Sequence, residues 1–398
     1  MSESKLAILG AGPTGIEAAL AAAERGWSFT LYEAGPEVAD HLRDWGHVRL
    51  FSPWSLDVSP RMRGALTAAG RTVPKTESCP TGRELREQVL APLAATPALA
   101  PHLRYDSRVV AISRDGLLKH EEIGTDRRAE REFRLLIRDA SGRETIETAT
   151  VVLDCTGAYS QPNWLGDGGI PAPGEQAAAE RIEHRMPDFE QTRSTWSGQR
   201  ALLIGAGYSA QTVAVGLARL LADDDPPQVL WALRRAEPHW PVDADDPLPE
   251  RSALTAAARE LAQGATPGFA VRTGVAIDRF EEQAGGLAVT LRDRAGTCET
   301  VVVDRVLGLT GAVGDHSIYR QLQIHECYAT GAPMKLSAAL LGAGGGDCLT
   351  QESHGAETLL NPEPNFFILG AKSYGRNTTF LMRVGWQQVD EVFALLER

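Results

Sequence analysis

The sequence lacks several features that would assign it to common functional classes. Its five cysteines are scattered and include no Cys-x-x-Cys pair, so it encodes no disulfide framework, zinc ribbon or redox-active dithiol. Positive charge is scarce: 40 Lys and Arg stand against 52 Asp and Glu, which gives a net charge of −12. Because nucleic acids and anionic membrane surfaces bind clustered positive charge, we expect neither of them as a partner.

Long hydrophobic runs are also missing. The longest apolar stretch near the start, Ile16–Ala23, contains Glu17 and is much shorter than the roughly 20 residues that cross a bilayer. The opening Met-Ser-Glu-Ser-Lys has neither the basic segment nor the cleavage site of a signal peptide. Together with the scattered, odd-numbered cysteines, these absences predict a reduced, cytoplasmic protein. Its 398 residues are enough for two or three domains.

A strand, a glycine turn and a helix follow one another at the N-terminus. The apolar run Leu6–Leu9 leads into a Gly-x-Gly-x-x-Gly sequence at 10–15, and the helix-forming segment Ile16–Arg25 comes next. A second apolar strand, Trp27–Tyr32, ends at Glu33. Strand, turn, helix and acidic strand end in this order are the complete dinucleotide-binding fingerprint.

Each position of this fingerprint has a physical role. Gly10 permits the sharp turn, Gly12 has no side chain to keep a pyrophosphate from the helix N-terminus, and Gly15 lets the helix pack closely on the sheet. Glu33 can accept hydrogen bonds from a ribose diol. We predict that this unit binds FAD, or else NAD. Its predicted cofactor-binding residues are Gly10, Gly12, Pro13, Thr14, Gly15 and Glu33.

A second unit of the same kind begins about two hundred residues later. The strand Arg200–Ile204 leads into a Gly-x-Gly-x-x-Ala turn at 205–210, followed by a helix over Gln211–Ala222 and a strand over Val229–Leu233. Two arginines follow this second strand in place of a carboxylate. A guanidinium pair can chelate a 2′-phosphate, which a carboxylate would repel, so we predict NADPH here. The predicted binding residues are Gly205, Gly207, Tyr208, Ser209, Ala210, Arg234 and Arg235.

The alternative for Arg234 and Arg235 is that they are solvated surface charges. Two dinucleotide-binding units in one chain favour the functional interpretation, because they suggest hydride transfer between two cofactors. The strand Thr148–Asp154 runs into a Thr-Gly pair, and the segment Val301–Gly311 repeats this pattern. The charged stretch Lys119–Glu132 is predicted to be a solvated hairpin or flexible loop.

These features predict an α/β protein with two Rossmann-like, three-layer ββα dinucleotide-binding domains, the second inserted in the first. The expected boundaries are 1–160 for the first part of the FAD-binding domain, 161–307 for the NADPH-binding domain, and 308–398 for the second part of the FAD-binding domain.

This arrangement resembles the two-dinucleotide-binding flavoproteins, which include flavin-containing monooxygenases, Baeyer–Villiger monooxygenases and thioredoxin-reductase-like enzymes. The resemblance covers nearly the whole chain: both fingerprints, both Thr-Gly strands and the closing segment Phe366–Gly370. In that family the closing glycine lies near the flavin ribityl chain, and a helix aimed at the flavin follows, here expected to begin at Thr378. The segments 45–54 and 372–376 are most similar to those of bacterial monooxygenase-like flavoproteins.

The resemblance extends the set of predicted cofactor-binding residues. Trp54 is expected as an apolar wall, and Val109 lies in the strand-like segment Leu103–Arg114. The full addition consists of Trp54, Val109, Thr156, Gly157, Gly370 and Thr379. The sequence also departs from the family pattern. Ala371 and Lys372 follow Gly370, where many flavin reductases have an Asp, and the missing dithiol argues against thioredoxin-reductase chemistry.

The chemistry that the resemblance implies is oxygenation. NADPH would reduce the flavin, O₂ would give a flavin C4a-hydroperoxide, and a small molecule with a nitrogen, sulfur or similar soft centre would be oxidised. The candidate catalytic residues are Arg49, Ser52, Tyr374, Arg376 and His354. Two alternatives stay open: a reductase that passes electrons to a quinone, a disulfide or a partner protein, and a redox-sensing protein that binds FAD and NADPH without turnover.

Other partners receive less support from the sequence. The acidic loops Asp223–Asp225 and Asp243–Asp246 have no ligand spacing, so we expect no metal site. A homodimer is left open as the oligomeric state.

Overall fold

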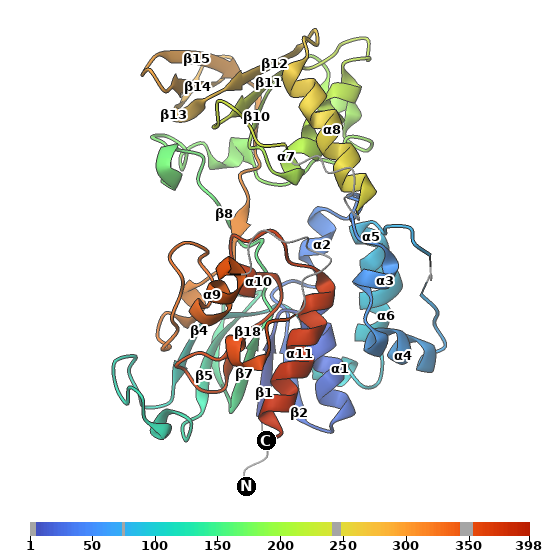
Figure 1. Cartoon of the computed structure of the whole chain (residues 1–398), viewed down its shortest axis with the longest axis vertical. Coiled ribbons are helices and arrows are strands. Elements are labelled where there is room, and N and C mark those ends of the chain that lie inside the picture. The colour runs from blue at the N-terminus through green and yellow to red at the C-terminus, as the bar shows by residue number, and fades with distance from the viewer. Residues whose placement is uncertain (1–4, 74–75, 241–247, 343–352) are drawn as a thin grey trace. The chain divides into compact units, whose positions relative to one another are not determined.

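The computed structural model describes residues 5–73, 76–240, 248–342 and 353–398. The chain forms two compact units, one made of 1–161 and 313–398 and the other of 162–312 (Figure 1). The first unit is therefore built from both ends of the chain. β8 (Gln161–Pro162) and β17 (Ala312–Val313), at the two boundaries, pair as a two-stranded sheet.

A five-stranded parallel sheet forms the centre of the first unit. The strand order is β18 (Phe366–Ile368), β7 (Val151–Asp154), β1 (Lys5–Leu9), β2 (Ser28–Tyr32) and β3 (Leu103–Arg104). Successive side chains of β1 point to opposite faces: Leu6 and Ile8 join the core cluster that contains the helix residue Phe393, whereas Ala7 and Leu9 join the one that contains Phe133. The sheet is covered on both faces, which explains its uninterrupted apolar strands.

The two covering layers differ. On one face, α1 (Pro13–Glu24) and α11 (Met382–Leu396) lie side by side (Figure 1). On the other face lies an antiparallel sheet of β4 (Ser107–Arg114), β5 (Phe133–Asp139) and β6 (Glu144–Ala149). Further helices of this unit are α2 (His41–Asp44), α3 (Trp54–Asp57), α4 (Pro60–Ala68), α5 (Gly82–Leu85), the π-helix 86–90, α6 (Ala91–Ala94), α9 (Met334–Gly342) and α10 (Ala371–Tyr374).

The second unit repeats this plan. Its parallel sheet has the order β12 (Phe269–Thr273), β11 (Gln228–Leu233), β10 (Arg200–Ile204), β16 (Arg305–Gly308) and β9 (Ile182–Glu183). The helices of this unit are α7 (Tyr208–Leu220) and α8 (Pro249–Gln263), and its antiparallel sheet consists of β13 (Val275–Gln283), β14 (Gly286–Asp293) and β15 (Cys298–Val303). The predicted class, two Rossmann-like domains with three-layer ββα architecture, is confirmed.

The helix starts differ from those expected. α1 begins at Pro13 and α7 at Tyr208, three residues earlier than predicted in each case, because the second half of each glycine motif already forms the first helical turn. α11 begins at Met382 and not at Thr378. Asn377 causes this delay, since its side-chain oxygen accepts the backbone N–H of Thr379 at 3.0 Å and holds an Asx turn there.

The prediction that Lys119–Glu132 is solvated is wrong at Arg128. That side chain is 1% exposed and its guanidinium donates to Glu363 at 2.7 Å. Arg114 donates to the same carboxylate, also at 2.7 Å, and is 2% exposed. The charged stretch is therefore anchored to the core by a buried carboxylate that two arginines share. No helix in the described part of the chain is long and apolar enough to span a membrane.

Candidate functional site

The first glycine turn connects β1 to α1 and leaves space in front of the helix. Gly10 has a φ of +90°, and a Cβ atom there would lie 2.7 Å from the carbonyl oxygen of Cys155. A Cβ atom at Gly15 would lie 1.8 Å from the Gly10 oxygen, so the helix packs directly on the turn. At Gly12, the N-cap of α1, a Cβ atom would meet nothing within 4 Å among the described residues. The positive end of the helix dipole thus faces open space at Gly12.

Glu33 lies at the end of β2, beside this turn. One of its carboxylate oxygens accepts the N–H of Ala11 at 2.9 Å and the other accepts the N–H of Gly35 at 3.0 Å. Burial raises the pKa of this carboxyl by more than the two backbone donors lower it, so the net shift is upward. Each oxygen retains a free lone pair, so the carboxylate is held in place and can still accept a ribose hydroxyl.

The closing strand β18 brings a third segment to the start of α1. Gly370 has a φ of +70°, and a Cβ atom there would lie 2.6 Å from Oγ1 of Thr14. The N–H of Gly370 donates to Oε1 of Gln388 on α11 at 2.8 Å. A Cβ atom at Gly385 on α11 would lie 3.0 Å from the same threonine oxygen. Thr14, Gly370 and α11 therefore converge, and Thr379 lies in the turn before α11.

A buried lysine holds the turn that follows β7. The Nζ of Lys372 donates to Asp154 Oδ2 at 2.6 Å, to Thr156 Oγ1 at 3.1 Å and to the Asp315 carbonyl at 2.7 Å. The side chains of Lys372 and Asp154 are both 0% exposed. Asp154 Oδ1 accepts both the N–H and the hydroxyl of Thr156, and Gly157 follows with a φ of +75°. The sequence showed Lys372 only as a departure from the family pattern; the structure shows that it fixes this turn.

Val109 lies on β4, half-buried and opposite Ile137. Its strand is anchored beside the glycine turn, because the N–H of Ser107 donates to the Glu33 carbonyl at 2.8 Å.

The candidate residues of the segment 45–54 lie in different environments. Arg49 is exposed; it forms a β-bridge with Thr81 and donates to the Cys79 carbonyl. Ser52 is 8% exposed and donates to Asp57 Oδ1 at 2.5 Å. Trp54, expected as a wall of the site, is only 3% exposed and packs into the core of the first unit at the start of α3. It therefore presents very little surface to a cofactor or substrate.

Asp57 is a functional candidate that the sequence analysis missed. It is 1% exposed, Ser52 donates to one carboxylate oxygen, and the other oxygen has no hydrogen-bond partner in the described parts of the chain. Burial raises the pKa of Asp57 to about 7, although the Ser52 hydrogen bond lowers it. In the sequence, only the closeness of Ser52 and Asp57, which stand on either side of Pro53, could have suggested that these two side chains form a hydrogen bond.

Asp57 is expected to make stability depend on pH. Its pKa is higher in the folded state than the ordinary 3.8, so the folded protein retains this proton and is favoured at low pH. That contribution is complete below the ordinary value and is lost as the pH rises to about 7. We expect the unfolding free energy of wild type, relative to Asp57→Asn, to fall by about 1.4 kcal/mol per pH unit across this window.

Urea unfolding of both proteins over this pH range measures the difference. Asp126→Asn, at an exposed site, is the matched control and should run parallel to wild type. Parallel profiles for wild type and Asp57→Asn would contradict the raised pKa.

Tyr374, His354 and Arg376 lie in the closing segments of the first unit. Tyr374 is 0% exposed, its ring meets Phe380 edge-on, and burial raises the pKa of its phenol to about 12. Neither the Tyr374 hydroxyl nor His354 Nε2 has a hydrogen-bond partner in the described segments. Arg376 is exposed and lies beside Gly331, where a Cβ atom would be 3.1 Å from its guanidinium. Two buried polar atoms without partners are consistent with a polar occupant nearby.

The second glycine turn has the same construction as the first. Gly205 has a φ of +128°, and a Cβ atom there would lie 2.2 Å from the Leu309 carbonyl oxygen. Gly207 is the N-cap of α7, and a Cβ atom there would meet nothing within 4 Å among the described residues. Gln211 fixes the turn, since it is 3% exposed and donates to the Ala206 carbonyl at 3.0 Å. Tyr208, Ser209 and Ala210 form the first turn of the helix.

Arg234 and Arg235 directly follow β11 and are exposed. Their guanidinium groups make no hydrogen bond or ion pair with the described residues, so both remain able to bind an anion. The acidic segment Asp243–Asp246 lies outside the described residues. Within the described ones, no group of His, Cys, Asp or Glu side chains could hold a metal ion.

Comparison with known proteins supports the fold assignment. No family model and no curated protein sequence matches the chain. Among solved structures, bacillithiol disulfide reductase from Bacillus cereus aligns with a TM-score of 0.68 at 17% identity, covering 99% of this chain and 98% of that one. The ornithine N-hydroxylase KtzI from Kutzneria gives 0.64 at 14%, covering 99% of both chains. Thioredoxin reductase from T. acidophilum gives 0.60 at 14%, covering 100% of both.

At sequence identities this low, the similarity shows that the folds are alike. It extends over the full length of disulfide reductases and of a hydroxylase whose structure holds reduced FAD and NADP⁺. The resemblance drawn from the motifs is confirmed at this level: the chain has the fold of the two-dinucleotide-binding-domain flavoproteins.

Proposed function

We propose that the protein is an oxidoreductase that binds FAD at its first glycine turn and NADPH at its second. The observation that carries this proposal is the open space in front of two helix N-termini, at Gly12 and at Gly207, each reached by a parallel strand. The positive end of each helix dipole favours a pyrophosphate there. The fold likeness to structures with bound FAD and NADP⁺ supports the same pair of cofactors.

In this proposal, different residues of the first unit bind different parts of FAD. The turn around Gly12 holds the pyrophosphate, and Glu33 accepts from the ribose. Thr14 and Gly370 would lie beside the ribityl chain, and Thr156 with Gly157 would lie beside the phosphates or the adenosine. Val109 is assigned to the same site. Thr379 lies before α11, whose N-terminus stabilises negative charge on the reduced ring.

The arginine pair determines the choice of nicotinamide cofactor. We expect Arg234→Ala/Arg235→Ala to weaken NADPH binding by at least about tenfold, because charge-assisted hydrogen bonds to the 2′-phosphate are lost. The KM for NADH should stay nearly unchanged. Steady-state kinetics with both cofactors measures this, and Arg294→Ala, at another exposed site of the second unit, is the matched control. An unchanged preference would remove the basis for naming NADPH.

We further propose that the enzyme is a monooxygenase acting on a small molecule with a nitrogen, sulfur or similar soft centre. When bound, FAD supplies the chemistry, accepting hydride from NADPH and activating O₂. The protein orients substrate and donates hydrogen bonds; we assign these roles to Arg49, Ser52, Tyr374, Arg376 and His354. Ser52 donates its only hydroxyl proton to Asp57, so its part is to accept a hydrogen bond from an occupant. The buried Tyr374 hydroxyl has no partner among the described residues and can donate to a group that reaches it.

The state of Cys155 and the missing Cys-x-x-Cys pair favour this choice over disulfide reduction. Cys155 adjoins the first glycine turn, yet it is 7% exposed and burial raises the pKa of its thiol well above the ordinary value. A neutral, buried thiol is a poor nucleophile, and the sequence contains no Cys-x-x-Cys pair to exchange with a disulfide.

The experiment combines three measurements on purified protein. We expect a yellow protein, rapid bleaching by NADPH without oxygen, and, with ¹⁸O₂ and a panel of amines and sulfides, one labelled oxygen in the product per NADPH consumed. Electron transfer to a quinone or disulfide without oxygen incorporation would show the reductase instead. Binding of both cofactors without bleaching would show a redox sensor.

A further inference from the structure

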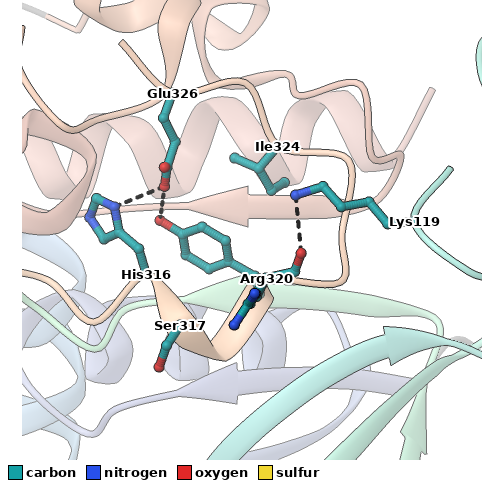
Figure 2. Close-up of a pocket in the computed structure, with 7 residues that line it drawn as sticks. Lys119, His316, Ser317, Arg320, Ile324 and Glu326 are labelled. Atoms are coloured by element: carbon teal, nitrogen blue, oxygen red, sulfur yellow. Dashed lines mark hydrogen bonds and ion pairs between the residues drawn. The ribbon is translucent and has the colours of Figure 1, made fainter. Parts of the chain in front are cut away.

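A pocket of about 290 Å³ lies in the first unit, away from both glycine turns in the sequence. Figure 2 shows its lining. Most of it comes from the segment 316–326, and Lys119 reaches in from the loop after β4. Its volume is at the lower end of the range for small-molecule sites. The Tyr319 ring and the Ile324 side chain form its apolar part.

Hydrogen bonds hold one side of the pocket in a fixed geometry. Tyr319 donates its hydroxyl to Glu326 Oε1 at 2.8 Å, and His316 Nδ1 lies 2.8 Å from the same oxygen (Figure 2). Partial burial by itself raises the pKa of Glu326. The hydrogen bonds with His316 and Tyr319 lower this pKa by more than burial raises it, so the net shift is downward. The only carboxylate of the lining is therefore ionised and already engaged by two partners.

The other side of the pocket carries positive charge without a matching carboxylate. Lys119 Nζ donates to the backbone carbonyl of Arg320 at 3.0 Å (Figure 2). It forms no ion pair with a described carboxylate, although its charge helps to lower the pKa of Glu326. The Arg320 guanidinium has neither an ion pair nor a hydrogen-bond acceptor in the parts of the chain that the structure describes. Two cations on a lining that also contains the Ile324 side chain match a small anion that has a short carbon portion.

We propose that this pocket binds a small organic carboxylate. The Arg320 guanidinium receives the carboxylate, whose planar geometry matches two parallel N–H donors, and Lys119 adds a second charge. The carbon portion lies against Tyr319 and Ile324. The lining shares no residue with the predicted dinucleotide sites, and the proposal does not depend on the oxidoreductase assignment.

Tyr319 also connects the pocket to the interior. Lys372 Nζ lies 5.0 Å from the centre of its ring and bonds Asp154 and Thr156. A ligand that binds this pocket of the folded protein is therefore expected to stabilise the first unit, and the unfolding midpoint should rise with ligand concentration.

Isothermal titration of the purified full chain, with whatever cofactor it carries and without NADPH, tests the proposal. The probes are malonate and inorganic phosphate, with sodium chloride at equal ionic strength as the reference. We expect malonate to bind at a single site. Arg320→Gln and Lys119→Met should each weaken it by at least about fivefold, the loss of one charge-assisted contact. Arg71→Gln and Lys335→Met, at exposed sites elsewhere in the unit, should not.

Specific outcomes of the titration would overturn the proposal. Equal malonate affinity in wild type, Arg320→Gln and Lys119→Met would overturn the site, as would binding no stronger than in chloride. Binding of phosphate alone would overturn the carboxylate assignment. Both lysine and arginine are exposed, so either variant can carry the test if the other folds poorly. A colourless or inactive protein would count against the oxidoreductase proposal and leave this measurement unaffected.

Discussion

Gly12→Val is expected to give a folded protein that has lost its FAD. The backbone at Gly12 has a φ of −76° and a ψ of −173°, an extended conformation that valine adopts readily. A Cβ atom there meets nothing within 4 Å among the described residues, so the polypeptide itself tolerates the side chain. The isopropyl group would instead fill the space in front of α1, where the pyrophosphate must approach the helix N-terminus.

The visible spectrum of the purified variant measures this loss. We expect flavin occupancy to fall at least about tenfold, since the blocked contact is a charge-assisted one at a helix dipole. Gly64→Val is the matched control, because a Cβ atom at Gly64 on α4 also meets nothing within 4 Å among the described residues, far in sequence from the turn. Full occupancy in Gly12→Val would mean that the first turn does not hold FAD.

The glycine turns could be predicted because their determinants are local. A glycine motif between an apolar strand and a helix-forming segment constrains the backbone through a few adjacent residues, and Gly10 and Gly205 have the positive φ values that such turns need. The same locality explains why the acidic and basic strand ends, Glu33 and Arg234, could be placed. In each case one stretch of about thirty residues contains the whole signal.

The missed residues depend on contacts between distant segments. Arg128 and Glu363 are 235 positions apart, and Lys372 and Asp154 are 218 apart. A charged residue normally indicates a solvated surface, and only the tertiary partner shows that it is buried. Trp54 illustrates the converse: an aromatic residue in a distinctive loop was expected to line the site, but it packs into the core instead.

Lys372→Met is expected to be the most destabilising single substitution considered. It would leave the Asp154 carboxylate, whose side chain is 0% exposed, without its counter-charge. Removing one partner of a buried ion pair costs about 3–5 kcal/mol, because the remaining charge has neither water nor a cation around it. Lys372→Met would also remove the donor to the Asp315 carbonyl and to the Thr156 hydroxyl, and so loosen the turn that we assign to FAD.

The double variant Lys372→Met/Asp154→Asn distinguishes a charge effect from a loss of packing. Removing both charges eliminates the buried unpaired ion, so we expect the double variant to recover most of the stability that the single one loses. The urea concentration at the unfolding midpoint, compared at constant slope of the transition, measures the stability of the single and of the double variant. The exposed Lys335→Met is the control. If the double variant were no more stable than Lys372→Met, the lysine would act through its contacts with Thr156 and Asp315, and the ion pair would contribute little. If the single variant lost less than about 1 kcal/mol, within the range of exposed pairs, the pair would not be buried as the structure shows.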